Sequence, residues 1–154
     1  MEASERSPRL RVAAAVTRGK QLLVVRHRKE GREYYLLPGG GVAWGESMTE
    51  ALSREIEEET GLKVQAGKLL CFSETIFPDR SRHIVNMVFR GIERGGELKP
   101  SRDVRVAGAG FVDFHDLKRI ELLPPIAEFL IHARRSRYVG GAVYLGKVWK
   151  DVDR

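Results

Sequence analysis

The stretch GGVAWGESMTEALSREIEEETGL, residues 40–62, decides the fold of this chain. It opens with glycines, which favour unusual backbone angles or a close approach of the backbone to another group. Ser47 and Glu50 then form an S-x-x-E capping box, a pattern that begins a helix. Gly61 is the residue type best suited to the left-handed position that ends one. The sequence therefore predicts a glycine loop that leads directly into a helix over residues 47–60.

The predicted helix has one apolar and one acidic face. Its core-facing stripe repeats at every fourth position and consists of Met48, Leu52 and Ile56. Glu55, Glu58 and Glu59 share another face, because their spacing is i, i+3 and i+4. Like charges at these separations destabilise a helix by about 0.2–0.5 kcal/mol per pair, and the helix dipole disfavours negative charge in the last turn. A bound divalent cation would remove this repulsion, whereas a solvated acidic face is the alternative interpretation.

A longer pattern covers the same residues and resembles a known family. The spacing G-x5-E-x7-R-E-U-x-E-E-x-G-U, in which U is aliphatic, runs from Gly40 to Leu62 and resembles the Nudix box at every specified position. Ala43 stands where many members carry Glu, outside the positions that define the box. The resemblance extends over roughly residues 10–135 and implies an α/β fold, a Nudix-type α/β/α sandwich with a mixed β-sheet between helices.

The rest of the chain is consistent with this fold. Apolar and β-branched runs predict strands at 10–17, 21–27, 34–37, 62–76, 83–92 and 110–114. We expect a polar loop at 93–107 and a closing helix at 124–135. Residues 142–149 partly alternate, and three interpretations stay open: an edge strand, a contact with a partner subunit, or loose order. By domain, we expect a flexible N-terminus (1–9), a Nudix domain (10–136) and a C-terminal extension of that domain (137–154).

The resemblance assigns roles to residues of the box. It implies that Glu55, Glu58 and Glu59 bind a divalent metal ion, with the backbone carbonyl of Gly39 as a further ligand. The set of oxygen donors suits Mg²⁺, with Mn²⁺ as a substitute, and no His or Cys cluster favours zinc. Glu58 or Glu59 would also accept a proton from the attacking water.

Three further residues complete the predicted catalytic set. Arg54 would orient the carboxylates through its planar guanidinium, with Glu46 as its partner. Family members often add one carboxylate from a later loop, and Asp103 is the first candidate here, ahead of Glu97 and Glu93.

Candidates for substrate binding are less well defined by the sequence. Arg26 is a candidate for a phosphate contact, and Tyr35 and Phe77 for stacking on a base. Arg80 follows in the segment Phe77-Pro78-Asp79-Arg80, and Gly40 completes the set. A proline at this distance from the box resembles the ADP-ribose pyrophosphatase subgroup, while the same segment resembles MutT-type enzymes that clear 8-oxo-dGTP. Pro78-Asp79 is also an ordinary turn pair.

The predicted function follows from the resemblance. We expect a magnesium-dependent Nudix hydrolase that cleaves the pyrophosphate bond of a nucleoside diphosphate linked to another moiety, ADP-ribose being the first example. A MutT-type pyrophosphohydrolase of damaged (d)NTPs is the alternative within enzymes. A non-catalytic nucleotide-binding regulator is the alternative outside them. Processing of RNA 5′ ends fits the basic charge, but nucleic acid is not the expected partner.

Composition limits the remaining possibilities. The 154 residues suffice for one domain, and the net charge of +6 suits phosphorylated ligands as well as nucleic acid or an anionic membrane surface. No apolar run is long enough to span a membrane, and the polar start of the chain lacks the apolar stretch of a signal peptide. Cys71, the single cysteine, is expected to be a buried core thiol. We therefore expect a cytoplasmic protein. The resemblance implies a homodimer, because family members of this size often pair, and the C-terminal segment could supply the interface.

Overall fold

The computed structural model describes residues 6–149. Residues 1–5 and 150–154, which the sequence assigns to the N-terminus and to the C-terminal extension, lie outside the described residues. The strands are β1 (Arg9–Arg18), β2 (Gln21–Lys29), β3 (Arg32–Leu36), β4 (Gly39–Gly41), β5 (Leu62–Ile76), β6 (His83–Gly96), β7 (Val106–Asp113), β8 (Leu122–Leu123) and β9 (Val143–Lys147). The helices are α1 (Met48–Thr60), the 3-10 turn η1 (Phe114–Asp116) and α2 (Ala127–Arg135).

The strands form one mixed sheet, as predicted. Its order is β8-β3-β2-β1-β6-β5-β9, with β4 added to β1 and β7 added to β2. β1 and β6 run parallel, whereas β5 and β6 form a long antiparallel ribbon. The hairpin of β1 and β2 is paired only at its turn, where Thr17 lies opposite Leu22 and Arg18 opposite Gln21. Beyond the turn, β1 therefore separates from β2 and pairs with β4 and β6.

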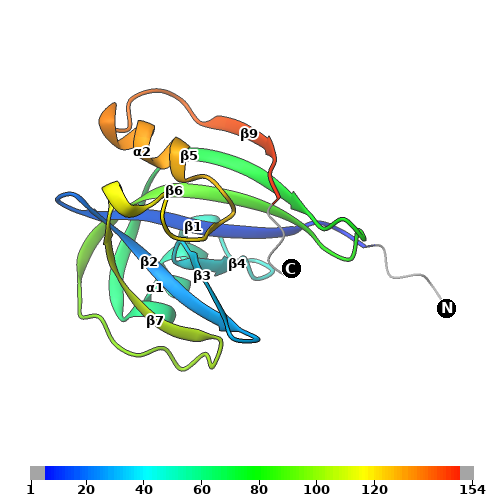
Figure 1. Ribbon diagram of the computed structural model, residues 1–154, viewed down its shortest axis with the longest axis horizontal. Helices are drawn as coiled ribbons and strands as arrows, with labels where there is room; N and C mark the ends of the chain where they lie inside the picture. Colours follow the sequence, from blue (N-terminus) through cyan, green and yellow to red (C-terminus); the bar gives the residue numbers. More distant parts are fainter. Residues whose placement is uncertain (1–5, 150–154) are drawn as a thin grey trace.

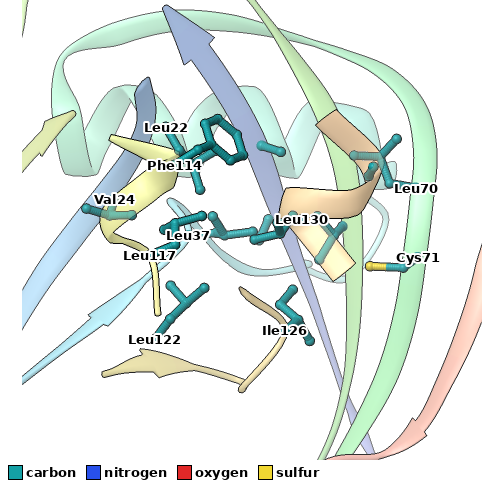
Figure 2. Close-up of a cluster of buried hydrophobic side chains, with 14 of the residues drawn as sticks. Leu22, Val24, Leu37, Leu70, Cys71, Phe114, Leu117, Leu122, Ile126 and Leu130 are labelled. Carbon is teal, nitrogen blue, oxygen red and sulfur yellow. The ribbon is translucent and has the colours of Figure 1, made fainter. Parts of the chain in front are cut away.

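The sheet lies between the two α-helices, and each of its faces has its own core (Figure 1). On one face, Val12, Ala14 and Val16 of β1 pack with Leu52 and Ile56 of α1. The intervening residues of β1 point to the opposite face, because side chains alternate along a strand. There they join α2 in the cluster of Figure 2, which includes Ala13, Ala15, Leu22, Val24, Cys71, Ile126 and Leu130. The predicted α/β/α sandwich is confirmed.

Helix α1 begins and ends as the sequence predicts. The hydroxyl of Ser47 accepts a hydrogen bond from the amide of Glu50 at 3.1 Å, and the Glu50 carboxylate accepts one from the amide of Ser47 at 2.8 Å. Gly61 follows the helix with φ of 81°, and its amide donates to the carbonyl of Glu57. Leu52 and Ile56 are fully buried, so the predicted apolar stripe fixes the direction of the acidic face.

Other boundaries differ from the predictions for a common reason. β6 continues to Gly96 and β7 begins at Val106, so the predicted polar loop is shorter at its start and end. Both strands are extended by backbone pairing with β5 and β2, which polar side chains permit on a solvent-facing surface. Residues 143–147 form the edge strand β9, one of the three alternatives left open.

Two smaller expectations concern burial and membrane segments. Cys71 is buried and free, as predicted, and burial raises the pKa of its thiol to about 12. Within residues 6–149, no helix has the length and the apolar character needed to cross a membrane.

Candidate active site

A cleft of about 970 Å³ lies where β4 meets the last turns of α1. This size is within the range of small-molecule sites in proteins. Its floor is glycine backbone, and one wall is the acidic face of the helix. The residues that meet here from these two elements are Gly39, Gly40, Gly41, Glu55, Glu57, Glu58 and Glu59.

Glycine is required in β4 because other atoms lie too close to its backbone for a side chain to fit. Gly39 and Gly40 pair with Ala13 and Val12 of β1. A Cβ atom on Gly40 would lie 2.3 Å from the carboxyl carbon of Glu55, and one on Gly39 would lie 2.0 Å from the carbonyl oxygen of Val12. Glycine at position 40 leaves space for the Glu55 carboxylate, and glycine at position 39 allows β4 to lie against the backbone of β1.

Arg54 fastens the glycine segment to the helix. Its Nε and Nη2 donate to the two carboxylate oxygens of Glu46 at 2.7 and 2.9 Å, the two-point contact expected from the sequence. The Nη2 group also reaches the carbonyl of Gly41 at 3.2 Å, and Nη1 donates to Glu55 at 2.9 Å. The hydrogen bond from Arg54, helped by the amide of Ala43, lowers the pKa of Glu46 to about 2.

Glu59 is the carboxylate whose environment is most unusual. Burial raises its pKa to about 7, and the negative charges of Glu55 and Asp103 add to this effect. The guanidinium of Arg11 and a hydrogen bond from the Gly39 backbone oppose it. The buried carboxyl of Glu59 is therefore stabilised at neutral pH by binding a proton or a cation.

These residues fit a divalent cation chemically. All donors are oxygen atoms, which is the set that Mg²⁺ prefers. In residues 6–149, no three carboxylate, imidazole or thiol groups form a ready ligand set. Arg54 instead contacts Glu55 and lies 3.6 Å from Glu58. The metal-ligand roles of Glu55, Glu58, Glu59 and Gly39 stay a prediction.

The predicted loop carboxylate lies in the same cleft. Asp103 lines it together with Arg105, whose guanidinium binds Asp103 at 2.7 Å and lowers the pKa of Asp103 to about 2. The described lining of the cleft includes neither alternative candidate: Glu93 on β6 binds Arg18, and Glu97 is exposed.

An outer chamber of about 690 Å³ adjoins the carboxylate end of the cleft. Both spaces are lined by Arg11, Tyr34, Leu36, Arg82 and Ile84, so they meet at these five residues and are treated together as one cleft. We call the carboxylate end the inner half and the adjoining chamber the outer half. An elongated ligand can therefore span both halves.

Two predicted substrate residues line this cleft, and three lie elsewhere. Gly40 lines the inner half and Phe77 the outer half. Tyr35 packs against the core cluster beneath α2, because alternation along β3 turns its side chain away from the cleft. Arg26 is half-exposed and lies 3.6 Å from Glu33. Arg80 is at the tip of the turn after β5, with φ of 57°.

Several residues that the sequence did not predict line the cleft. Tyr34 and Arg82, each one or two positions from a predicted residue, line both halves of the cleft. Arg11 also lines both and donates to the carbonyl of Leu37 at 2.9 Å. The signal for Arg11 was present, since it is a charged residue inside an otherwise apolar strand. His27 lines the inner half, and Trp149 the outer half.

Known proteins share this sequence pattern and fold. The model of the NUDIX domain matches residues 7–133. A relative named ADP-ribose pyrophosphatase, from Methanocaldococcus jannaschii, is 37% identical over 101 residues, which are 66% of this chain and 59% of that protein. The chain thus spans about three fifths of the length of that relative.

Solved structures agree. A MutT NUDIX hydrolase from Burkholderia pseudomallei is 29% identical, with a TM-score of 0.69 over 82% of this chain and 98% of its own. A NUDIX hydrolase from Nitrosomonas europaea, 19% identical, shares the fold with a TM-score of 0.74 over 85% of this chain and 90% of its own. The glycine strand, the capped helix and the match over residues 7–133 together place this chain in the NUDIX domain family.

Proposed function

We propose that this protein is a magnesium-dependent hydrolase that cleaves the pyrophosphate bond of a nucleoside diphosphate linked to another moiety, such as ADP-ribose. The observation that carries the proposal is the inner half of the cleft. There the glycine backbone of β4, the acidic face of α1 and Asp103 meet in a space of the size of a small-molecule site. The helix carboxylates are gathered on one wall of the cleft, where a bound cation would offset their charge beside an anionic substrate.

In this proposal, Glu55, Glu58 and Glu59 hold the cation and the Gly39 carbonyl assists them. When bound, the metal ion lowers the pKa of a water molecule and offsets the charge of phosphate oxygens. Arg54 holds Glu55 in place and keeps the glycine segment against the helix. Glu58 or Glu59 accepts the proton of the attacking water.

Arginines of the cleft are suited to the substrate's phosphates. Arg11 and Arg82 line both halves, at the positions between the acidic helix face and the outer half. Their positive charges would attract the pyrophosphate and balance the helix carboxylates. Arg11 is already positioned by its hydrogen bond to Leu37, so little side-chain entropy is lost when it contacts a phosphate.

Two substrate classes remain, and each has support. The M. jannaschii relative, an ADP-ribose pyrophosphatase, supports ADP-ribose. The 29% identical B. pseudomallei protein is a MutT NUDIX hydrolase, the type for which we expect a (d)NTP. The products distinguish the two: ADP-ribose would give AMP and ribose 5-phosphate, and a (d)NTP would give a nucleoside monophosphate and pyrophosphate.

The test is product identification by chromatography on a panel of both substrate classes with Mg²⁺. We expect one class to be turned over by the wild type and by Glu57→Gln, and not by Glu58→Gln. Glu57 is the matched control: it also lines the cleft, but it stands at a position that the box leaves open, so loss of activity in this variant as well would show that the effect is not specific to the predicted metal ligands. Absence of turnover by the wild type on every member, with nucleotide binding retained, would replace the proposal with that of a non-catalytic regulator.

Three finer expectations belong to the same proposal. Mg²⁺ is the expected metal, and Mn²⁺ should substitute for it. We propose a homodimer, which is supported by exposed apolar residues on and before the edge strand β9, namely Val139, Val143 and Tyr144. Light scattering at several protein concentrations tests it. The free, buried Cys71 fits the reducing environment of the cytoplasm.

A further inference from the structure

The segment after α2 lies beyond the family match, which ends at residue 133. It is fixed to the domain by strand β9, which runs parallel to β5 with Val143 opposite Cys71 (Figure 1). Two further contacts follow: the Tyr144 hydroxyl binds the Glu74 carboxylate, and the amide of Val148 donates to the Glu74 carbonyl at 2.8 Å. The segment is therefore held in place up to residue 148.

This anchoring delivers Trp149 into the outer half of the cleft. Trp149 and Val148 both line it, next to Phe77 from the end of β5. The Trp149 and Phe77 rings pack edge to face, with centroids 4.5 Å apart and an angle of 62° between the planes. On the Phe77 ring, the guanidinium of Arg82 lies 5.6 Å from the centroid. Both aromatic rings are partly exposed, so they present ring surface to a ligand.

The chemistry of the cleft changes from one half to the other. The inner half carries the carboxylates of α1, whereas the outer half holds the aromatic rings of Phe77 and Trp149 and two prolines beside charged side chains of both signs. Arg11, Tyr34 and Arg82 belong to both halves and connect them. A nucleotide whose pyrophosphate lies at the carboxylates therefore extends its organic part toward Trp149.

We propose that Trp149, supplied by the C-terminal segment, stacks on the nucleobase of the substrate, while Phe77 packs against the Trp149 ring and holds it in place. This inference rests on the proposed function for the direction in which the substrate lies. An aromatic ring is the side chain best suited to the role, because every base has a π-face and stacking contributes substantially to binding. Trp149 is a positioning residue that favours substrates carrying a base, since the reacting bond is at the other end of the cleft.

A fluorescence experiment tests base stacking without requiring turnover. The chain has two tryptophans, and the other one, Trp44, is fully exposed in the loop before α1. Trp44→Phe leaves Trp149 as the single tryptophan. Titration of this variant with AMP in EDTA should give a saturable quench, and ribose 5-phosphate should give none, because it lacks the base. No quench by AMP up to millimolar concentration, or an equal quench by ribose 5-phosphate, would overturn the inference.

Kinetics give the second readout. At about 1–3 kcal/mol per stacked base, Trp149→Ala should raise KM for the accepted nucleotide by roughly 5- to 150-fold and leave kcat within about twofold. Trp149→Phe keeps a ring and should restore most of the affinity. An unchanged KM, a fall confined to kcat, or a gain in kcat/KM on removal of the ring would contradict the proposal.

The two proposals fail separately. A quench by AMP without hydrolysis of any substrate would retain the base site and reject the hydrolase. Hydrolysis that requires Glu58, without a quench and with an unchanged KM in Trp149→Ala, would retain the hydrolase and reject Trp149 as its base site.

Discussion

Replacement of Glu59 by glutamine should make the metal-free protein more stable at alkaline pH while it abolishes activity. In the folded protein, burial and neighbouring carboxylates move the pKa of Glu59 from 4.5 to about 7. In the unfolded chain, the carboxyl releases its proton near pH 4.5, whereas the folded protein retains that proton until about pH 7. Stability is thus lost as the pH rises through this window, and the loss is complete above pH 7.

The size of the effect follows from the pKa. One pH unit corresponds to 1.36 kcal/mol, so the window from 4.5 to about 7 gives about 3 kcal/mol. Solvent at the cleft mouth reduces this to about 2–3 kcal/mol. Glu59→Gln cannot ionise, so its stability relative to wild type should be higher at pH 8 than at pH 4.5 by that difference.

Urea unfolding in EDTA at pH 4.5 and pH 8 measures the difference in unfolding free energy between Glu59→Gln and the wild type. Glu57→Gln is the matched control, because it removes the same charge from the same helix at a solvent-exposed position, and the two pH values should give nearly the same difference for it. Addition of Mg²⁺ should raise wild-type stability at pH 8 and have much less effect on Glu59→Gln. An equal stability difference for Glu59→Gln at pH 4.5 and pH 8 would refute the argument that burial raises the pKa of Glu59 in the folded protein.

Four substitutions test the parts that hold the site and its supporting core. Gly40→Ala should fold and lose activity, since the new Cβ would meet the Glu55 carboxylate at 2.3 Å, whereas Gly39→Ala should fail to fold stably because its Cβ would meet strand backbone at 2.0 Å. Circular dichroism reports folding and a turnover assay reports activity, and the reverse pattern would contradict the assignment. Arg54→Lys loses the two-point contact and should lower kcat/KM by about 10- to 100-fold, with a stability change below about 1 kcal/mol; unaltered kinetics would show that the contact is dispensable. Leu130→Ala, in the core beneath α2 (Figure 2), should cost about 2–5 kcal/mol in urea unfolding without a change in KM, and a raised KM would show that this core shapes the cleft.

The box and its helix could be predicted because their determinants are local. The Ser47 cap, the terminal Gly61 and the apolar stripe depend on neighbours within a few residues, and all three are observed. The contact between Arg54 and Glu46 also lies within the box, so the spacing alone was enough to predict it.

Predictions that depend on tertiary arrangement were less successful. The sequence predicts Tyr35, whereas Tyr34 lines the cleft, because alternation along a strand does not reveal which face meets a cleft until the pairing partners of the strand are known. The sequence predicts Arg80, whereas Arg82 lines the cleft, because the direction of each side chain depends on the conformation of the turn after β5. Trp149 could not be assigned from the sequence, since its position depends on the pairing of β9 with β5, about 70 residues earlier in the chain.

The most direct test of the central claim is metal-dependent cleavage of a pyrophosphate bond. Protein treated with EDTA should be inactive on its accepted nucleotide and regain turnover as Mg²⁺ is added, with the nucleoside monophosphate accumulating in step. Glu58→Gln should stay inactive at the Mg²⁺ concentration that saturates the wild type, and Glu57→Gln should behave like the wild type. Turnover that is independent of Mg²⁺, or full activity of Glu58→Gln, would contradict the account of the acidic helix face as the metal site of a hydrolase.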